Sequence, residues 1–418
     1  MLVTQICFAQ WYPQNSGTTY NLWAVSFTDV NNGTVVGSVS ILRTTNGGTD
    51  WISQTSGTQA VLWGVSFTDA NNGTAVGMDG VILRTINGGT DWTEQTSGTI
   101  NGLSGVSFTD ANNGTAVGQL GTILRTTNGG STWQTQSSGT SYDLYGVSFT
   151  DLNNGTVVGA EDNFGTYSSV ILRTTNSGTT WTLQPGPGNT FLKAVCITDL
   201  NNGTAVGYGY NGQYYWGAIL STTNGGINWN EQTSVTTNTL VGVSFTDANT
   251  GTAVGGNGTI LKTTNGGTTW TTQTSGTSNF LYGVSFTDAN NGIVIGEGGT
   301  ILRTTNGGTT FVEEEYLNGI PTEFLFAQNY PNPFNPSTKI KYSIPQSSNV
   351  IIKVFDILGN EVETLVNEEK PTGTYEITWN AANLPSGISA RGGYASGVYF
   401  YTINAGSFIE TKKMILLK

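Results

Sequence analysis

TTNGGTDW, residues Thr44–Trp51, is the first of seven near-copies of one eight-residue phrase, and six of the seven end in tryptophan. The other copies begin at Thr85, Thr126, Thr174, Thr222, Thr263 and Thr304. Successive copies start 41, 41, 48, 48, 41 and 41 residues apart. A period of about 40 to 45 residues with several short strands in each unit is typical of a β-propeller. Seven copies therefore predict seven blades.

One unit, Leu62–Thr99, contains four short strands, as a propeller blade requires. These strands are LWGVSF, GTAVG, VILRT and WTEQ. The Asn-Gly step of TDANNG supplies the positive φ angles that a tight hairpin turn needs. A leftover segment, WYPQNSGT (Trp11–Thr18), matches WTEQTSGT but has no such phrase before it. We expect it to pair with blade seven (Leu281–Glu315), because closing the ring removes free strand edges.

The phrase resembles the Asp-box of bacterial-neuraminidase-type repeats, with Asn in place of Asp. The whole unit, VSFTDANNGTAVG followed by ILRTTNGGTTW, is similar to the photosystem II stability and assembly factor-like propeller family over residues 11–315. This resemblance implies a structural box, in which the polar side chain holds turn amides and the tryptophan packs between blades. We expect the basic third-strand residues to stack on this tryptophan or to be solvated. They are Arg43, Arg84, Arg125, Arg173, Lys262 and Arg303, with Ser221 in blade five.

The repeat stops after Phe311, and a second domain follows. Glu313–Glu315 and Gly319–Pro321 are typical of a linker, and the apolar strands beyond them predict a small Ig-like antiparallel β-sandwich. The segments NYPNPFNPST, VFDILGNEV and SGVYFY are very similar to the type A C-terminal sorting domain of the type IX secretion system, over residues 328–418. That resemblance implies the type IX secretion machinery as a partner, and a secreted or outer-membrane surface-attached protein.

The fold class expected is therefore all-β, with four-stranded propeller blades followed by the sandwich. Residues 1–10 are expected to be the remnant of a truncated signal peptide, because MLVTQICFAQ is apolar and short but has no basic start. A leading strand is the alternative. The propeller is expected at residues 11–315, a linker at 316–325 and the sorting domain at 326–418.

Composition excludes several functions. The chain has no histidine, which removes Ser-His-Asp and Cys-His catalysis. Residues 11–315 carry 7 Lys and Arg against 19 Asp and Glu, so they would repel nucleic acid. No apolar run is long enough to span a membrane. The DANNG-type turns offer one carboxylate each, too few for Ca²⁺. We expect no metal, no cofactor and a monomer.

Function is expected where the blades differ. From the last Gly of strand two to the Ile of strand three, blades four and five need twelve residues (Gly159 to Ile171, Gly207 to Ile219) instead of four or five. We expect these inserts to form long loops on one face of the ring. Their aromatic and acidic residues are the candidate ligand site: Glu161, Asp162, Phe164, Tyr167, Tyr208, Tyr210, Tyr214, Tyr215 and Trp216. A variable first-strand position at the channel mouth extends it: Trp23, Trp63, Tyr145, Lys193 and Tyr282.

Aromatic side chains with few carboxylates suit sugar rings or peptide segments. We therefore expect a non-catalytic binding propeller with a glycan or protein ligand and no catalytic residues. Three alternatives stay open. The loop aromatics could pack on each other and only cover blade edges. A sialidase-like glycoside hydrolase would need two non-repeated carboxylates. An assembly-factor-like scaffold for an envelope complex follows from the family resemblance alone.

Overall fold

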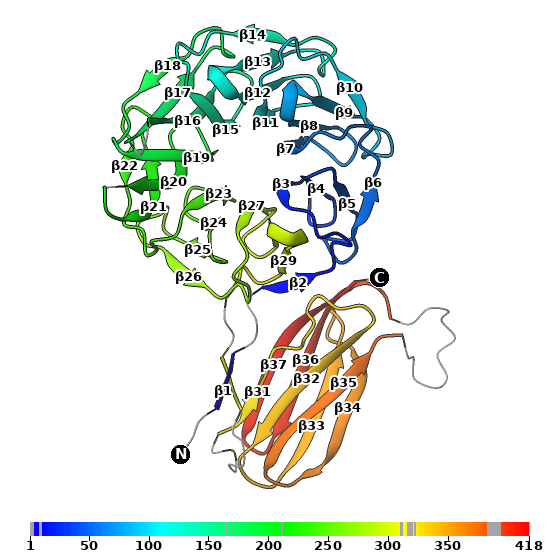
Figure 1. The fold of residues 1–418 in the computed structure, drawn as a ribbon. Helices are drawn as coiled ribbons and strands as arrows, with labels where there is room; N and C mark the ends of the chain where they lie inside the picture. Colours follow the sequence, from blue (N-terminus) through cyan, green and yellow to red (C-terminus); the bar gives the residue numbers. More distant parts are fainter. Residues whose placement is uncertain are drawn as a thin grey trace. The chain divides into compact units, whose positions relative to one another are not determined.

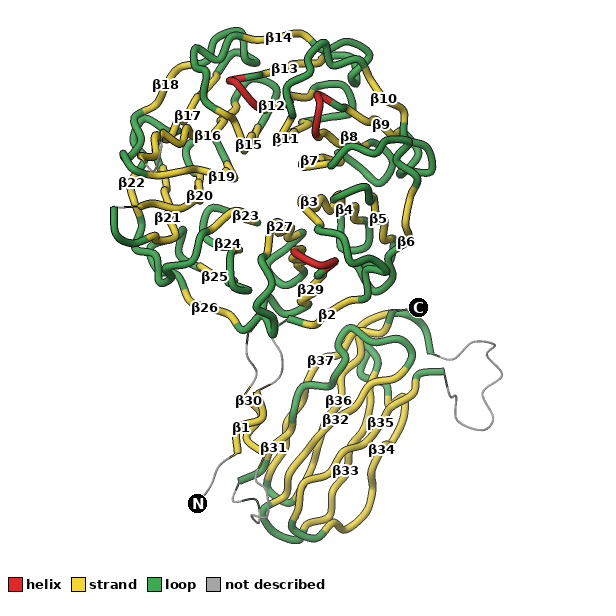
Figure 2. The backbone as a smooth tube through the Cα atoms, viewed as in Figure 1, coloured by secondary structure: helices red, strands yellow, loops and turns green. Residues whose placement is uncertain are grey.

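The computed structural model describes residues 4–7, 11–163, 166–210, 212–309, 312–315, 321, 323–382 and 394–417. It divides the chain into two compact units, Phe8–Phe311 and a second one made of Met1–Cys7 with Val312–Lys418. In the described part, helix is limited to three single 3₁₀ turns, η1 (Met78–Gly80), η2 (Gln119–Gly121) and η3 (Glu297–Gly299), drawn red in Figure 2. None of these could cross a membrane.

The first unit is a ring of seven four-stranded antiparallel sheets (Figure 1). Blade one contains β3 (Leu22–Phe27), β4 (Gly33–Gly37), β5 (Ile41–Thr44) and β6 (Ile52–Gln54). Blade two contains β7 (Leu62–Phe67), β8 (Gly73–Gly77), β9 (Ile82–Thr85) and β10 (Thr93–Gln95). Blade three contains β11 (Leu103–Phe108), β12 (Gly114–Gly118), β13 (Ile123–Thr126) and β14 (Gln134–Gln136).

Blade four contains β15 (Asp143–Phe149), β16 (Gly155–Asn163), β17 (Thr166–Thr174) and β18 (Thr182–Gln184). Blade five contains β19 (Thr190–Ile197), β20 (Gly203–Tyr210), β21 (Tyr215–Thr222) and β22 (Asn230–Glu231). Blade six contains β23 (Leu240–Phe245), β24 (Gly251–Gly255), β25 (Ile260–Thr263) and β26 (Thr271–Gln273). Blade seven contains β27 (Leu281–Phe286), β28 (Gly292–Gly296), β29 (Ile301–Thr304) and β2 (Tyr12–Gln14). The sequence prediction of seven four-stranded blades is confirmed.

The strand order explains the residue types in each blade. First strands surround the axis and fourth strands form the rim (Figure 1). Every residue of the second strand β8 is buried, whereas two of the three residues of β10 at the rim are exposed. Small residues are needed beside the first strand, because a Cβ on Gly73 would lie 2.2 Å from the ring of Phe67. The GTAVG strands therefore consist of small residues because little space is left beside the first strand.

The N-terminal segment closes the ring, as the sequence predicts. β2 pairs antiparallel with β29, with Tyr12 opposite Arg303. Trp11 is 1% exposed, donates Nε1–H to Gln273 Oε1 of blade six (3.0 Å) and meets the ring of Phe286 edge-on at 5.8 Å. It thus supplies the tryptophan of blade seven. Phe311, the aromatic residue that ends the seventh repeat in the sequence, lies outside the described residues.

Because β2 fills the fourth-strand position beside β29, the chain beyond the seventh repeat pairs elsewhere. Residues 312–315, expected at the end of blade seven and the start of a linker, form β30 (Val312–Glu315). This strand pairs with β1 (Thr4–Cys7), which lies inside the stretch expected to be a signal remnant. Both strands belong to the second unit.

Three side-chain contacts join most blades to the next, and we call each set an inter-blade joint. Between blades two and three, Ser66 Oγ accepts a hydrogen bond from the Phe108 amide (3.1 Å). The Arg84 guanidinium lies over the Phe108 ring, 5.3 Å from its centroid. Gln95 Oε1 accepts from Trp133 Nε1 (3.3 Å). Each blade's own backbone groups are paired within its sheet, so these side chains carry the connection.

The joints correct one expectation about the basic third-strand residues. Arg43, Arg84 and Arg125 are buried rather than solvated. They lie over the first-strand phenylalanine of the following blade, at 5.2, 5.3 and 5.4 Å, and not on the box tryptophan. A guanidinium covering a ring face is favoured by the ring quadrupole, more so when both are out of water. These arginines hold blades together.

Toward blade six, blade five lacks the contacts of the basic residue and the glutamine, and in the remaining contact the Cys196 thiol meets the Phe245 amide in place of a serine hydroxyl. Ser221 replaces the basic residue, and Cys196 replaces the serine at the first-strand position. Gln232 Nε2 donates to Ser221 Oγ of its own blade (2.7 Å). The buried Trp270 Nε1 consequently has no hydrogen-bond partner among the described atoms. Burial raises the pKa of the Cys196 thiol, and the Phe245 amide partly offsets this effect.

The joint between blades four and five is also reduced. Ile197 stands where other blades carry phenylalanine, so Arg173 has no ring to cover and only donates to Leu200 O (3.3 Å). Gln184 donates within its own strand, to Thr182 O. Trp229 Nε1 is buried without a partner in the described part of the chain. Blade five is therefore the most weakly joined blade.

The second unit contains two antiparallel sheets that share one core. One sheet holds β31 (Leu325–Phe326), β32 (Ser337–Ile344) and β35 (Gly373–Asn380). The other holds β34 (Glu361–Lys370), β33 (Ser348–Phe355), β36 (Gly397–Ala405) and β37 (Phe408–Leu416). Tyr342 and Trp379 from the first sheet are buried with Tyr401 and Met414 from the second. Phe324, inside the expected linker, stacks on Phe408 at 5.0 Å.

Replacing Trp11 with alanine is expected to lower the free energy of unfolding of the propeller by about 3–5 kcal/mol, because a large buried side chain and its hydrogen bond are lost. Urea unfolding followed by tryptophan fluorescence measures this, since ten of the eleven tryptophans lie in the propeller. Tyr12→Ala, at an exposed neighbour, is the control and should change the value by less than about 1 kcal/mol. Equal losses in the two variants would contradict the closure role of Trp11.

A second pair of variants tests the joints. Arg84→Ser should destabilise the propeller by about 1–3 kcal/mol, because it removes the ring contact and a hydrogen bond to Ala111 O (2.8 Å). Ser221→Arg places a guanidinium beside Phe245 and should stabilise by about 0.5–1 kcal/mol. Urea midpoints of both variants and the wild type check this. A neutral Arg84→Ser would show that the joint contributes little.

Candidate functional site

The inserts of blades four and five extend the second and third strands. β16 and β17 stay paired from Gly155–Thr174 to Asn163–Thr166, and β20 and β21 from Gly203–Thr222 to Tyr210–Tyr215. The expectation of long loops is therefore wrong. The ladder continues through both inserts, so their backbone groups pair with each other, and in β20 aromatic and small residues alternate as Tyr208, Gly209 and Tyr210. Phe164 lies outside the described residues.

The two extended hairpins bring aromatic rings together. The hairpin cluster consists of Tyr167, Tyr208, Tyr210, Tyr215 and Phe191. Tyr167 meets Tyr208 and Phe191 edge-on, at 5.4 and 5.6 Å. Phe191 and Tyr208 are stacked at 5.1 Å. Tyr210 and Tyr215 lie 4.6 Å apart, and the Tyr167 and Tyr215 hydroxyls are 3.5 Å apart. Rings in such arrangements stabilise one another beyond their burial.

Two of the predicted mouth residues extend this cluster toward the axis. Lys193 Nζ lies 3.7 Å from the ring centroid of Tyr145 and 4.5 Å from that of Phe191. Burial lowers the pKa of Lys193 to about 8, and the carboxylate of Asp143 partly opposes this. The Lys193 ammonium is thus covered by aromatic rings. It is a poor isolated anchor for an anion.

A second set of rings lies where blades seven and one meet, and we call it the seam cluster. Trp23 and Tyr282 are 4.2 Å apart, and Phe280 stacks on Tyr282 at 4.9 Å. Trp23 Nε1 donates to Ser38 Oγ (3.3 Å), and Glu297 Oε2 accepts from the Phe280 amide (3.3 Å). Both clusters lie on the mouth face, the face that carries the turns between second and third strands.

The remaining predicted residues are not part of the two ring clusters, although some lie next to them. Trp63 packs against Gly102, whose Cβ would lie 2.6 Å from the indole. Trp216 points to the opposite side of its strand from Tyr215, where it covers Gly209 and donates to Glu231 Oε1 (3.1 Å). Tyr214, at the hairpin tip, is 63% exposed. Glu161 and Asp162 lie on β16, Asp162 opposite Tyr167.

Sequence reasoning missed Phe191 and Phe280. Both occupy the residue just before the first-strand leucine, which reads Asn21, Val61, Gly102, Asp143, Phe191, Thr239 and Phe280 around the ring. This position varies as much as the one two residues later, where Lys193 and Tyr282 stand. Because alternate residues of a strand share a face, the two variable positions point the same way. The sequence variation at both positions was the signal that could have identified Phe191 and Phe280.

The chemistry of the mouth face is that of a contact surface. The hydrogen bond to Tyr215 raises the pKa of Tyr167, and burial raises that of Tyr208 to about 12, so these phenols stay neutral donors. Asp143 accepts from the Leu120 amide (2.9 Å), as Glu297 does from Phe280. Nowhere in the described chain do three acidic or cysteine side chains come close enough to hold a metal ion.

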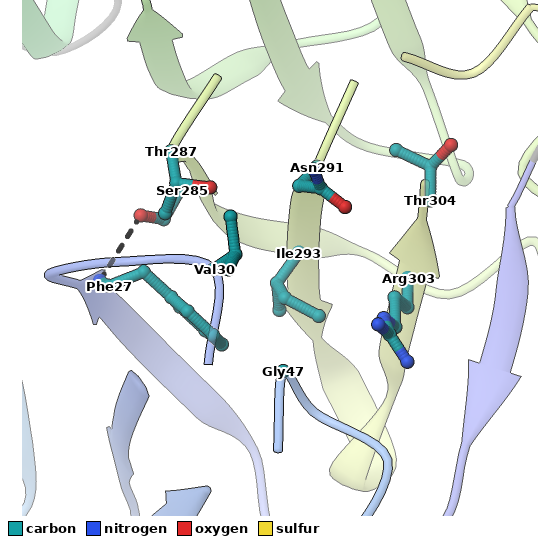
Figure 3. Close-up of a pocket in the computed structure, with 10 residues that line it drawn as sticks. Phe27, Val30, Gly47, Ser285, Thr287, Asn291, Ile293, Arg303 and Thr304 are labelled. Carbon is teal, nitrogen blue, oxygen red and sulfur yellow. Dashed lines mark hydrogen bonds between the residues drawn. The ribbon is translucent and has the colours of Figure 1, made fainter. Parts of the chain in front are cut away.

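The cavities belong to the scaffold. One internal space of about 10 Å³, enough for about one water, lies between blades seven and one beside Phe27, Ser285 and Arg303 (Figure 3). Figure 3 also shows the joint bond from the Phe27 amide to Ser285 Oγ (3.3 Å). Two open grooves, of about 570 and 810 Å³, are lined by equivalent repeat residues of blades six and two. No non-repeated aromatic residue lines them.

The low pKa of Lys193 has a testable consequence for stability. Because the folded-state pKa of about 8 lies below the ordinary 10.5, the unfolded chain binds more protons between these values. The free energy of unfolding should therefore rise with pH across this window. In Lys193→Met this rise is absent, so the variant's stability relative to wild type should fall from about pH 8 to about pH 9.5. A pH-independent difference in urea unfolding would contradict the burial of the ammonium.

Comparisons with known proteins agree with this architecture. The family model described as photosynthesis system II assembly factor YCF48 matches residues 98–237 and 227–321, together more than half of the chain. The model described as secretion system C-terminal sorting domain matches residues 328–389. No curated protein sequence matches the chain significantly.

Solved structures share the fold at low sequence identity. The structure titled YCF48 bound to D1 peptide is 20% identical, with a TM-score of 0.59, covering 73% of this chain and 97% of that one. YCF48 from Cyanidioschyzon merolae is 20% identical, with a TM-score of 0.57, covering 70% and 98%. The GH74 xyloglucanase from Xanthomonas campestris is 11% identical, with a TM-score of 0.57, covering 96% and 74%. The chain belongs to the photosynthesis system II assembly factor YCF48 family and carries a secretion system C-terminal sorting domain.

Proposed function

We propose that this secreted propeller is a non-catalytic binding protein whose mouth face recognises a segment of another protein. The observation that carries the proposal is the convergence of the non-repeated aromatic residues on that face, in the hairpin and seam clusters. A scaffold needs identical blades, so residues that depart from the repeat in exposed positions are candidates for contact with a partner. The sorting domain supports an extracellular or surface-attached setting.

The ring arrangement favours a protein ligand over a glycan. Sugar recognition commonly uses a free, flat ring face, but Phe191 and Tyr208 stack on each other, as do Phe280 and Tyr282. What the hairpin cluster exposes is the outer part of Tyr215, 49% exposed, beside Tyr214. Exposed tyrosines are common anchors in protein interfaces, because each combines a large apolar ring with a polar hydroxyl. The related YCF48 structure with a D1 peptide adds support at the level of the family.

A hydrolase is less well supported. Glycoside hydrolysis needs two carboxylates set around the scissile bond, whereas Asp143 and Glu297 accept hydrogen bonds from backbone amides. The likeness to a xyloglucanase at 11% identity concerns the fold alone. An assembly-type scaffold for an envelope complex is the form of protein binding that the family membership favours.

The double variant Tyr214→Ala/Tyr215→Ala is expected to weaken binding about 10- to 30-fold, the loss typical of removing an aromatic anchor. The probes are peptides that the wild-type protein selects from a phage-displayed random library, with a glycan array in parallel. Tyr330→Ala, at a 72% exposed tyrosine in the other unit, is the matched control. Peptide binding unaffected by the double variant would contradict the site. Binding to glycans alone, or their hydrolysis, would contradict the ligand class.

A further inference from the structure

The hairpin between β33 and β34 ends in two large apolar residues that point into solvent. Ile357 is 68% exposed and Leu358 is 81% exposed. Other described hairpin turns of this unit carry small, polar or proline residues: Pro345–Ser347, Pro371–Thr372 and Gly406–Ser407. An adjacent pair of large, exposed apolar side chains is unfavourable in water unless it contacts something else. We call this pair the apolar tip.

The turn that carries the tip is held rigidly by its polar residues. Asp356 Oδ1 accepts from the amides of Leu358 and Asn360, both at 2.9 Å. Asn360 Nδ2 donates to Asp356 Oδ2 (2.9 Å), and the Asp356 amide donates to Asn360 O (3.0 Å). Gly359 takes a φ of +84°, which this turn requires. The two apolar side chains are thus presented on a backbone that need not be ordered on binding.

The propeller shows that this turn chemistry does not need apolar residues. Its DANNG-type turns use a related, shorter arrangement, for example Asp69 Oδ1 accepting from the amides of Asn71 and Asn72. The residue after the Asp is large, apolar and exposed in three of these turns, as Val30, Leu152 and Leu200, but the residue after it is always Asn. Turn geometry therefore does not explain a second large apolar residue, Leu358.

We propose that the apolar tip is a docking element that inserts into an apolar pocket of the outer-membrane secretion machinery. The sorting-domain match spans it, so the tip belongs to the part of the chain whose role is to be recognised for export. A convex, preorganised apolar pair fits a concave apolar pocket. The flanking charges are already paired within the hairpin, Lys353 with Glu361 at 2.6 Å. The contact is therefore expected to depend on apolar area.

Export of the full chain tests this proposal, with the chain placed behind a periplasmic leader in a bacterium that carries this secretion system. Ile357→Ser/Leu358→Ser should reduce the secreted and surface-attached fraction at least about tenfold, with protein retained in the periplasm. Ile409→Ser, at a residue 69% exposed on β37 of the same unit, is the matched control and should be exported normally. The swap Ile357→Leu/Leu358→Ile keeps the apolar area and should also be exported.

Normal export of the serine pair would overturn the proposal. So would equal loss in the conservative swap, because the contact would then not depend on apolar area. Thermal melting of the purified variants guards against misfolding. If the serine pair melts lower than wild type, Leu358→Ser alone, at the more exposed position, decides by the same export measurement. Peptide binding by the mouth face is measured separately, so failure here leaves the proposed function untouched.

Discussion

The ring depends on one small contact that recurs between blades. In this contact a first-strand serine hydroxyl accepts a hydrogen bond from the backbone amide of the next blade's phenylalanine. It is seen from Ser26 to Phe67 at 3.1 Å and from Ser285 to Phe27 at 3.3 Å, where the ring closes. Within a blade the sheet already pairs the backbone, so adhesion between blades rests on side chains. Arg–Phe and Gln–Trp contacts connect the same blades, as between blades two and three. The joint with the fewest contacts therefore limits the stability of the closed ring.

Much of the fold could be predicted because it repeats. The 41-residue interval predicts the blades, and the match of Trp11–Thr18 to a fourth strand predicts the closure that β2 makes with β29. Contacts between repeats were harder to predict. In the sequence, Arg84 and Phe108 belong to different repeats, and only the folded ring of blades places the guanidinium over the phenyl ring. The tryptophan of blade seven, Trp11, similarly lies 262 residues from its hydrogen-bond partner Gln273 in blade six.

The candidate site was predicted in part. Tyr167, Tyr208, Tyr210 and Tyr215 do come together, but on extended hairpins. The alternation of Tyr208, Gly209 and Tyr210 could have indicated a strand. The rings also pack on each other, as one alternative held, so the exposed area is smaller than the sequence suggests. Trp216 faces the other way because adjacent residues of a strand point to opposite sides.

Blade five departs from the repeat both in its extended aromatic hairpin and in its contacts with the neighbouring blades. It carries four of the five residues of the hairpin cluster, and its joints lack the phenylalanine, the serine and the arginine found elsewhere. Loops and elements that bind partners commonly lie in the less stable parts of a fold. A weakly joined blade could adjust its hairpin to a partner while the other blades keep the ring closed. The substitutions at the joint positions are concentrated in blade five, which is consistent with a weaker requirement for adhesion between this blade and its neighbours.

Hydrogen–deuterium exchange of the joint amides tests this account most directly. The relevant amides belong to the residue that ends each first strand: Phe27, Phe67, Phe108, Phe149, Ile197, Phe245 and Phe286. The account predicts fastest exchange at Phe245, which faces Cys196. Ile197 and Phe27 should follow, because their amides keep the serine bond but their joints have no arginine over a ring and leave the tryptophan Nε1 without a partner among the described atoms, and exchange should be slow at Phe67 and Phe108. Uniform protection around the ring, or slowest exchange at Phe245, would contradict it.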